Sequence, residues 1–308
     1  MVSDADFKGR HVVSIKDFSN EEIMHVLDTA DKLMPFARNG NKMLDGKIIA
    51  TLFYEPSTRT RFSFECAMER LGGSILSFSE PKSTSVAKGE TLADTIRTIA
   101  CYSDVIVLRH PQEGAARLAS QFSSVPILNA GDGAGQHPTQ TLLDLFTIRK
   151  HKKEIKGKTV ALVGDLKYGR TTHSLAYALS RLGANLMFVS PPTLQMPKEV
   201  LGEVRKHGIE PKITSNIEEA VKEADVLYVT RIQKERFPDP EEYAKVAGVY
   251  RVDKALLEKA KPGMIVMHPL PRVDEISADV DSLPSAIYFE QAFNGVAVRM
   301  ALLKLILG

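Results

Sequence analysis

The segment STRTR, residues 57–61, places three hydroxyl groups and two guanidinium groups in five consecutive residues. An apolar stretch precedes it and a helical pattern follows, so the segment lies where a strand becomes a helix. Ser57 could be only a helix N-cap, but arginine at a helix N-terminus opposes the helix dipole unless an anion lies between. Hydroxyls, guanidinium groups and backbone N–H groups together form a phosphate site. The residue types at 57–61 therefore predict that phosphate binds here.

Polar side chains also follow most of the other predicted strands. Because ligands of parallel sheets bind beyond the carboxyl ends of the strands, these side chains are candidates for one binding site. They are Arg109, His137, Gln140, Lys167, Arg170, Arg231, Gln233, His268 and Arg272. Each has an ordinary alternative, such as a solvated arginine or a structural histidine. Together they indicate phosphate-type groups in the first half and carboxylate-type groups in the second. We expect a site that positions two anions and stabilises charge.

Short apolar runs, each followed by a turn and a helical pattern, supply the elements that would hold these residues. We predict eight strands, four in each half: KIIATLFY, SILSFSE, DVIVLRH, VPILNAG, TVALVGD, NLMFVSP, DVLYVTR and MIVMHPL. Continuous apolar strands separated by helices indicate parallel sheets covered on both faces. The predicted fold is α/β with two domains, each a mainly parallel sheet with helices on both faces. The basic end of the helix that begins at HPTQ, residues 149–158, is the predicted boundary between the halves.

The composition excludes several classes of protein. The 308 residues are 44% hydrophobic and 25% charged, with a net charge of +2, which is too weak to favour nucleic acid or a membrane surface. No apolar run approaches the ~20 residues of a membrane helix, and the first residues lack a signal-peptide core, so we expect a cytoplasmic protein. We find no paired Cys/His metal motif, no G-x-G-x-x-G fingerprint and no G-x-S-x-G elbow. We therefore expect no metal, no cofactor and no covalent nucleophile, and we expect Cys66 and Cys101 to be buried free thiols.

Several longer motifs resemble one family. STRTR, HPTQ and HPLPR, in this order, are similar to the carbamoyltransferases, and GDLKYGRTTHSL, TRIQKER and KGETLADT narrow the resemblance to the catalytic chains that act on aspartate. The resemblance runs from about Phe18 to the C-terminus. It implies transfer of the carbamoyl group of carbamoyl phosphate to the amine of L-aspartate, giving N-carbamoyl-L-aspartate and phosphate on the route to pyrimidines. It also implies a carbamoyl-phosphate-binding domain at 1–140, joined by the C-terminal helix 293–308, and an aspartate-binding domain at 141–292.

The resemblance gives each candidate residue a role. The residues that it implies for carbamoyl phosphate are Ser57, Thr58, Arg59, Thr60, Arg109, His137 and Gln140, with the backbone carbonyls of Pro269 and Leu270. Those implied for aspartate are Lys88, Arg170, Arg231 and Gln233. Arg59, Thr60, Arg109 and His137 are implied to be catalytic. Negative charge builds on the carbonyl oxygen as the amine attacks, and Thr60, Arg109 and His137 would stabilise it.

The resemblance also implies shared active sites. Ser85 and Lys88, in the loop KSTSVAKGE, match a loop that enters the neighbouring subunit's site in a homotrimer. Some relatives have one more residue between this serine and lysine, which affects the match of Ser85 more than that of Lys88. We also consider a separate regulatory chain as a further partner.

Three alternatives remain open at this point. A carbamoyltransferase for another amino acid, such as ornithine, would need acidic or neutral contacts and usually carries HCLPR and SMG motifs, whereas this chain has HPLPR and Arg231. A nicotinamide-dependent oxidoreductase or a non-catalytic phosphate-binding protein would fit the sheets alone.

For the amine proton, we rank the departing phosphate above His137 as acceptor, because one histidine nitrogen cannot both donate to the carbonyl and accept a proton.

Overall fold

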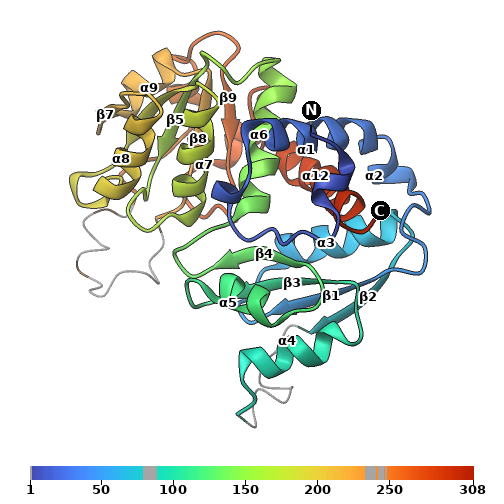
Figure 1. Ribbon diagram of the computed structural model, residues 1–308. Coiled ribbons are helices and arrows are strands. Elements are labelled where there is room, and N and C mark those ends of the chain that lie inside the picture. The colour runs from blue at the N-terminus through green and yellow to red at the C-terminus, as the bar shows by residue number, and fades with distance from the viewer. Residues whose placement is uncertain (1, 79–88, 233–240, 242–245, 247) are drawn as a thin grey trace. The chain divides into compact units, whose positions relative to one another are not determined.

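The computed structural model describes residues 2–78, 89–232, 241, 246 and 248–308 (Figure 1). The chain divides into two compact units. The first contains Met1–Phe146 and Ala292–Gly308, and the second contains Thr147–Gln291. The C-terminal residues thus belong to the N-terminal unit, which confirms that the last helix packs back on it.

The first unit is built around a parallel sheet with the strand order β2-β1-β3-β4 (Figure 1). Its strands are β1 (Ile48–Phe53), β2 (Ser74–Phe78), β3 (Val105–His110) and β4 (Ile127–Asp132). Its helices are η1 (Asp4–Phe7), η2 (Ile15–Asp17), α1 (Asn20–Leu33), α2 (Phe36–Asn39), α3 (Thr58–Arg70), α4 (Leu92–Ala100) and α5 (Ala115–Phe122). Because β1, β3 and β4 are neighbours and run in the same direction, the residues that follow them meet at one edge.

The alternation of side chains along β1 explains how this sheet is covered on both faces. Ala50 and Leu52 pack into a buried cluster with Ile96 of α4 and Ala116 of α5. Thr51, between them, points to the other face, where its hydroxyl donates to Glu65 of α3 at 2.9 Å. A strand that is buried on both faces is apolar over nearly its whole length, as β1 is apart from Thr51.

The second unit contains a parallel sheet in the order β7-β6-β5-β8-β9. Its strands are β5 (Thr159–Val163), β6 (Asn185–Val189), β7 (Lys212–Thr214), β8 (Val226–Val229) and β9 (Ile265–Met267). Its helical segments are α7 (Arg170–Arg181), η5 (Pro192–Leu194), α8 (Lys198–Lys206), α9 (Ile217–Glu223), α11 (Lys254–Leu257) and η7 (Ala278–Ser282). The sequence prediction missed β7, because this short edge strand carries two exposed residues and has no apolar run.

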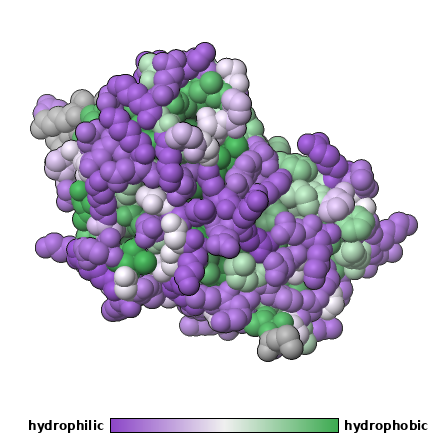
Figure 2. Space-filling model, turned by 90° about the horizontal axis from the view of Figure 1, so that it is seen from above, coloured by the Kyte–Doolittle hydropathy of each residue, from purple (hydrophilic) through white to green (hydrophobic). Residues whose placement is uncertain are grey.

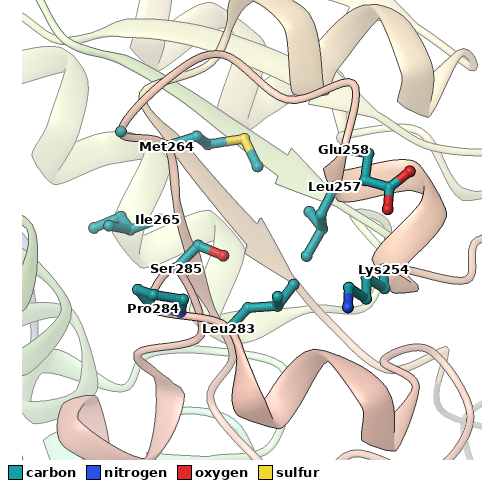
Figure 3. A pocket seen from close by; sticks show the side chains of 9 residues that line it. Lys254, Leu257, Glu258, Met264, Ile265, Leu283, Pro284 and Ser285 are labelled. Carbon is teal, nitrogen blue, oxygen red and sulfur yellow. The ribbon is translucent and has the colours of Figure 1, made fainter.

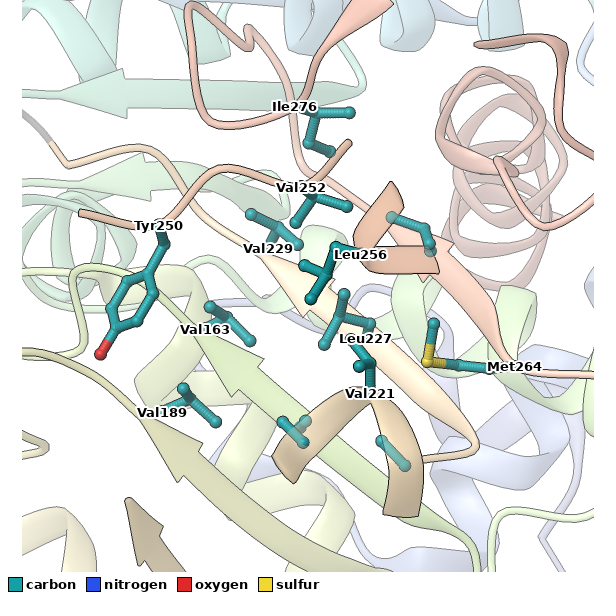
Figure 4. Packing of buried hydrophobic residues seen from close by; sticks show 14 of the residues in the cluster. Val163, Val189, Val221, Leu227, Val229, Tyr250, Val252, Leu256, Met264 and Ile276 are labelled. Atoms are coloured by element: carbon teal, nitrogen blue, oxygen red, sulfur yellow. The ribbon is translucent and has the colours of Figure 1, made fainter. Parts of the chain in front are cut away.

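A hydrophobic cluster holds α9 and α11 to one face of this sheet (Figure 4). Val163, Val189 and Val229 come from the strands, Val221 from α9 and Leu256 from α11. Their buried β-branched and leucine side chains supply the apolar area that stabilises the layer, at about 25 cal/mol per Å² of apolar surface removed from water. The eight predicted strands and the parallel α/β fold of both halves are confirmed.

Two long helices run from one unit into the other along the chain. α6 spans Pro138–Lys152 and α12 spans Tyr288–Leu307. α12 is buried over most of its length from Val296 to Ile306, as expected for a helix that is apolar nearly all round. No described helix combines the length and apolar character that crossing a membrane requires. The face of the molecule seen in Figure 2 is mainly hydrophilic, with hydrophobic residues in scattered patches.

Candidate active site

The N-terminus of α3 carries the predicted phosphate-binding segment. Ser57 is the N-cap of α3, but its side chain does not cap the helix. In α1, by contrast, the Ser19 hydroxyl accepts the Glu22 N–H at 3.1 Å in a capping box. The first turn of α3 also contains no acidic residue. The hydroxyl of Ser57 and the positive end of the helix dipole are thus available to an external anion.

The side chains of this segment differ in their surroundings. Thr58 and Arg59 are exposed, and Thr60 is buried at 6% exposure. Arg61 points along the helix, where its Nε lies 3.5 Å from Glu65, and it stacks over the ring of Phe62. Arg61 thus contacts its own helix through Glu65 and Phe62, whereas Arg59 is exposed.

Arg109 lies at the carboxyl end of β3, at the same edge of the sheet. Its Nη1 donates to the Ala130 carbonyl at the end of β4 at 3.2 Å. Its Nη2 lies 3.0 Å from Oε2 of Glu55, which follows β1. A phosphate that binds Arg109 must therefore compete with the Glu55 carboxylate. Sequence reasoning missed Glu55, because one acidic residue in the segment EPSTRTR has no distinguishing pattern.

The loop after β4 leads to His137 and Gln140. Gly133 has a φ of +50°, and a Cβ there would lie 2.7 Å from the Glu113 nitrogen. Glycine is required at this position, because the loops after β3 and β4 touch. Asp132 holds the loop, since its Oδ1 accepts the Gln136 N–H at 2.9 Å. Gly133 thus serves a tight loop.

His137 precedes α6 and is buried at 4% exposure. Its backbone carbonyl accepts the N–H groups of Gln140 and Thr141, both at 3.1 Å. Gln140 is also buried, at 8% exposure, and its Nε2 donates to Oδ1 of Asp144 at 2.9 Å. The first turn of α6 therefore fixes both residues, and they follow β4, the neighbour in the sheet of the strand β3 that carries Arg109.

In the second unit, Arg170 begins α7 after the turn GDLKYG, and it is 7% exposed. Asp165 shapes this turn by accepting the Tyr168 N–H at 3.0 Å. Gly164 has a φ of +117°, and a Cβ there would lie 2.3 Å from the Thr230 carbonyl. Because Arg231 follows Thr230, the close approach at Gly164 brings the backbone leading to both arginines to one edge of the second sheet.

His268 locks the HPLPR turn after β9. Its Nδ1 accepts the Leu270 N–H at 2.7 Å, so its Nε2 carries the proton and donates to Oε1 of Glu275 at 2.7 Å. The other carboxylate oxygen of Glu275 accepts the N–H groups of Val273 at 3.1 Å and Asp274 at 3.2 Å. The turn contains a cis Leu270–Pro271 bond, and Leu270 has a φ of +54°.

The hydrogen bonds of His268 and Glu275 have two consequences. Burial raises the pKa of Glu275, but the hydrogen bonds from His268 and from the backbone outweigh it, so the net pKa lies below its usual value. The lock also holds Leu270 in a left-handed conformation that is rare for a residue with a side chain. Its backbone carbonyl, together with that of Pro269, is thereby aimed in a fixed direction.

Other predicted residues have structural roles or cannot be placed. Arg272 donates to Asp281 and to the Tyr288 hydroxyl, so it braces the turn. Both cysteines are free, but the expectation that they are buried is wrong, since Cys66 is half-buried and Cys101 is exposed. Ser85, Lys88 and Gln233 lie outside the described residues.

A cavity of about 390 Å³ lies elsewhere in the second unit (Figure 3). Lys254, Leu257, Met264, Ile265 and Leu283 are among its lining residues. None of the predicted ligand-binding residues lines it, and its walls combine one lysine with one glutamate and apolar side chains. The anion-binding groups therefore identify the strand edges, and not this cavity, as the candidate site.

Comparisons with known proteins agree with the motifs. The model of the aspartate/ornithine carbamoyltransferase carbamoyl-P binding domain matches residues 10–150, and that of the Asp/Orn binding domain matches residues 156–306. The aspartate carbamoyltransferase catalytic subunit of Methanothrix thermoacetophila is 59% identical over 97% of this chain and 99% of its own.

Solved structures give the same result. The catalytic subunit of M. jannaschii aspartate transcarbamoylase has a TM-score of 0.89 and 56% identity, over 96% of this chain and 97% of its own. Aspartate transcarbamoylase from Trypanosoma cruzi, in complex with carbamoyl phosphate and aspartate, has a TM-score of 0.92 and 41% identity, over 99% of this chain and 97% of its own.

Proposed function

Because the chain belongs to the aspartate/ornithine carbamoyltransferase family, we propose that it transfers the carbamoyl group of carbamoyl phosphate to the amine of L-aspartate. The products are N-carbamoyl-L-aspartate and phosphate, in the synthesis of pyrimidines. The observation that carries this proposal is the uncapped N-terminus of α3 beside Arg109, which offers a phosphate site in a family that uses carbamoyl phosphate.

The first unit binds carbamoyl phosphate in this proposal. Ser57, Thr58, Arg59 and Thr60 hold the phosphate through their side chains and the N–H groups of the first turn of α3. Arg109 exchanges Glu55 for the substrate and reaches both phosphate and carbonyl oxygen. A guanidinium group suits this role, because its planar fork donates to two oxygens at once.

The chemical step needs no covalent enzyme intermediate. The aspartate amine attacks the carbamoyl carbon, and negative charge develops on the carbonyl oxygen, where Thr60, Arg109 and His137 donate hydrogen bonds. Removing one such donor typically costs about 10²–10³ in turnover. The C–O bond to phosphate then breaks, and the departing phosphate takes the amine proton. His137 as the proton acceptor is the alternative, but its proposed contact with the carbonyl oxygen occupies the same ring nitrogen.

The carbamoyl NH₂ group needs acceptors. Gln140 offers its amide oxygen, and Pro269 and Leu270 offer backbone carbonyls that the His268–Glu275 pair holds in place. A group held in this way loses little entropy when the substrate binds.

The second unit, in this proposal, binds aspartate through Arg170, Arg231 and Gln233. Two arginines match two carboxylates, whereas ornithine would bring a cation toward Arg231. The domains that carry these roles are 1–140 with 293–308 and 141–292, close to the division of the chain into compact units.

We also propose a homotrimer in which Ser85 and Lys88 of one chain complete the neighbour's site, with Lys88 contacting aspartate. Support comes from the edge strand β2, whose Leu76 is 44% exposed, and from Phe62 of α3, which is 52% exposed. A strand at the edge of a sheet and exposed apolar side chains are surface that another copy of the chain can cover. The similar chains are named catalytic subunits, which is consistent with an additional regulatory chain.

One assay tests the function directly. The purified protein is mixed with carbamoyl phosphate and either L-aspartate or L-ornithine, and both phosphate release and the carbamoylated amino acid are measured. We expect N-carbamoyl-L-aspartate and an equal amount of phosphate. A product formed only from ornithine would contradict aspartate as the substrate. Phosphate release with no carbamoylated product would contradict carbamoyl transfer.

A further inference from the structure

Gln140 has an amide that could face the substrate with either end. A carboxamide carries one acceptor oxygen and one donor NH₂ group of nearly equal size. Only the oxygen can accept a hydrogen bond from the carbamoyl NH₂ group of the substrate. The orientation of Gln140 therefore decides whether this contact attracts or repels.

Asp144 lies one turn further along α6 and faces this amide. Its Oδ1 accepts from Nε2 of Gln140 at 2.9 Å, and Asp144 is fully buried. A carboxylate has no proton to donate, so it accepts only the NH₂ end of the amide. The amide oxygen of Gln140 is then directed away from Asp144.

A buried cation, Arg299, offsets part of the free-energy cost of burying the Asp144 carboxylate. Arg299 of α12 is 2% exposed, and its Nη1 donates to the Gly295 carbonyl at 3.1 Å. Its guanidinium carbon lies 4.9 Å from the centre of the Phe64 ring of α3. Burial lowers the pKa of Arg299 to about 10, although the charge of Asp144 opposes this shift. Arg299 thus remains a cation at neutral pH and compensates the buried carboxylate.

We propose that Asp144 is a positioning residue that fixes the Gln140 amide with its oxygen toward the carbamoyl NH₂ group. The inference rests on the proposed function and adds a determinant of specificity to it. An i, i+4 pair on an exposed helix surface contributes little to stability. Here both residues are buried, so breaking this hydrogen bond would leave the Asp144 carboxylate without water to replace it.

The test compares two phosphonates that differ only at the group in question. Phosphonoacetamide has an NH₂ group where acetonylphosphonate has a methyl group, and their affinities are measured by titration calorimetry. Wild-type protein should prefer phosphonoacetamide. In Asp144→Asn, the new side chain carries both an acceptor oxygen and a donor NH₂ group, so it pairs with either end of the Gln140 amide and no longer fixes its orientation. The preference for phosphonoacetamide should fall about tenfold, with the affinity for acetonylphosphonate unchanged.

Two further variants separate orientation from stability. Asp144→Leu combined with Arg299→Met removes both buried charges, and the preference should fall here as well, because nothing then holds the amide. Leu145→Ala, at a buried position on the same helix, should lower stability and keep the preference. If Asp144→Asn keeps the wild-type preference, or weakens both phosphonates equally, the positioning role is wrong. If wild-type protein itself shows no preference, the proposed function fails together with the role of Asp144.

Discussion

At the scale of single residues, acidic side chains pair with the cationic and polar side chains of the candidate site and fix their orientation. Glu55 occupies Arg109, Asp144 orients Gln140, and Glu275 fixes His268. The first is a partly exposed ion pair, whereas the other two are buried hydrogen bonds. Buried contacts of this kind are costly to break, because the remaining partner loses its hydrogen bond without gaining water.

Arg231 tests the division of roles between the two units. Arg231→Ala should raise the aspartate concentration for half-maximal rate by roughly 10- to 150-fold, since a charge-assisted hydrogen bond contributes about 1.5–3 kcal/mol. The half-saturating concentration of carbamoyl phosphate should change much less. Steady-state kinetics with each substrate varied in turn measures both. A variant that loses only carbamoyl phosphate affinity would contradict the assignment.

Glu275 makes a prediction about stability and pH. In Glu275→Gln the new NH₂ group faces donors, so the free energy of unfolding should fall by about 1–3 kcal/mol at pH 7. Because the pKa of Glu275 lies below its ordinary value of 4.5 in the folded protein, its stabilising contribution is present above that pH. It is lost as the pH falls through the lowered value.

Urea unfolding of wild type and Glu275→Gln at pH 7 and at pH 4 checks this. The difference between the two proteins should narrow at the lower pH. Glu210→Gln is the matched control, since Glu210 is exposed and pairs only at the surface with Arg205, and it should change stability little. An equal effect at both pH values would show that the charge of Glu275 is not the cause.

At the scale of elements, α12 controls how α3 and α6 are held. Arg299 of α12 reaches Phe64 of α3 and carries a charge that balances Asp144 of α6. Gly295 makes this possible, because it leaves room for the guanidinium group and for Leu143 of α6. One glycine therefore supports the close packing of two helices that carry site residues.

Gly295→Ala should consequently destabilise the protein. The added methyl group would lie 2.4 Å from Nη1 of Arg299 and 3.1 Å from Cδ2 of Leu143, and overpacking of a core costs about 1–3 kcal/mol. Gly202→Ala in α8 meets no atom within 4 Å, so it should stabilise the helix by about 0.5–1 kcal/mol. Thermal unfolding of both variants measures the contrast. Two variants with the same melting temperature would refute the role of Gly295.

At the scale of the whole molecule, the proposed trimer predicts complementation between inactive chains. Arg59→Ala and Lys88→Ala should each be inactive in their own trimers, because each removes a group from every site. When the two are dissociated and reassembled together, some sites combine an intact Arg59 with an intact Lys88 from the neighbour. Those sites should recover activity, measured as N-carbamoyl-L-aspartate formed. Mixed trimers with no activity would place Lys88 in its own chain's site or outside it.

The sequence predicted the parallel sheets and the start of α3 because these depend on local patterns of apolar and hydroxyl residues. It missed β7, which is exposed at a sheet edge and stabilised by pairing with β6. It also missed Asp144 and Glu275, whose meaning depends on partners. Asp144 is compensated by Arg299, which is distant in the chain, and a buried carboxylate looks like any surface acid in a sequence.

The membership of α12 in the first unit has a consequence for biosynthesis. The second unit is one continuous segment, Thr147–Gln291, whereas the first unit is complete only when Ala292–Gly308 has been added. During translation, the half that begins first must therefore finish last, with Asp144 and Phe64 lacking Arg299 until the ribosome has made the final helix. A nascent chain that stops early is thus left with an unfinished first unit and exposed apolar surface, which chaperones and proteases recognise.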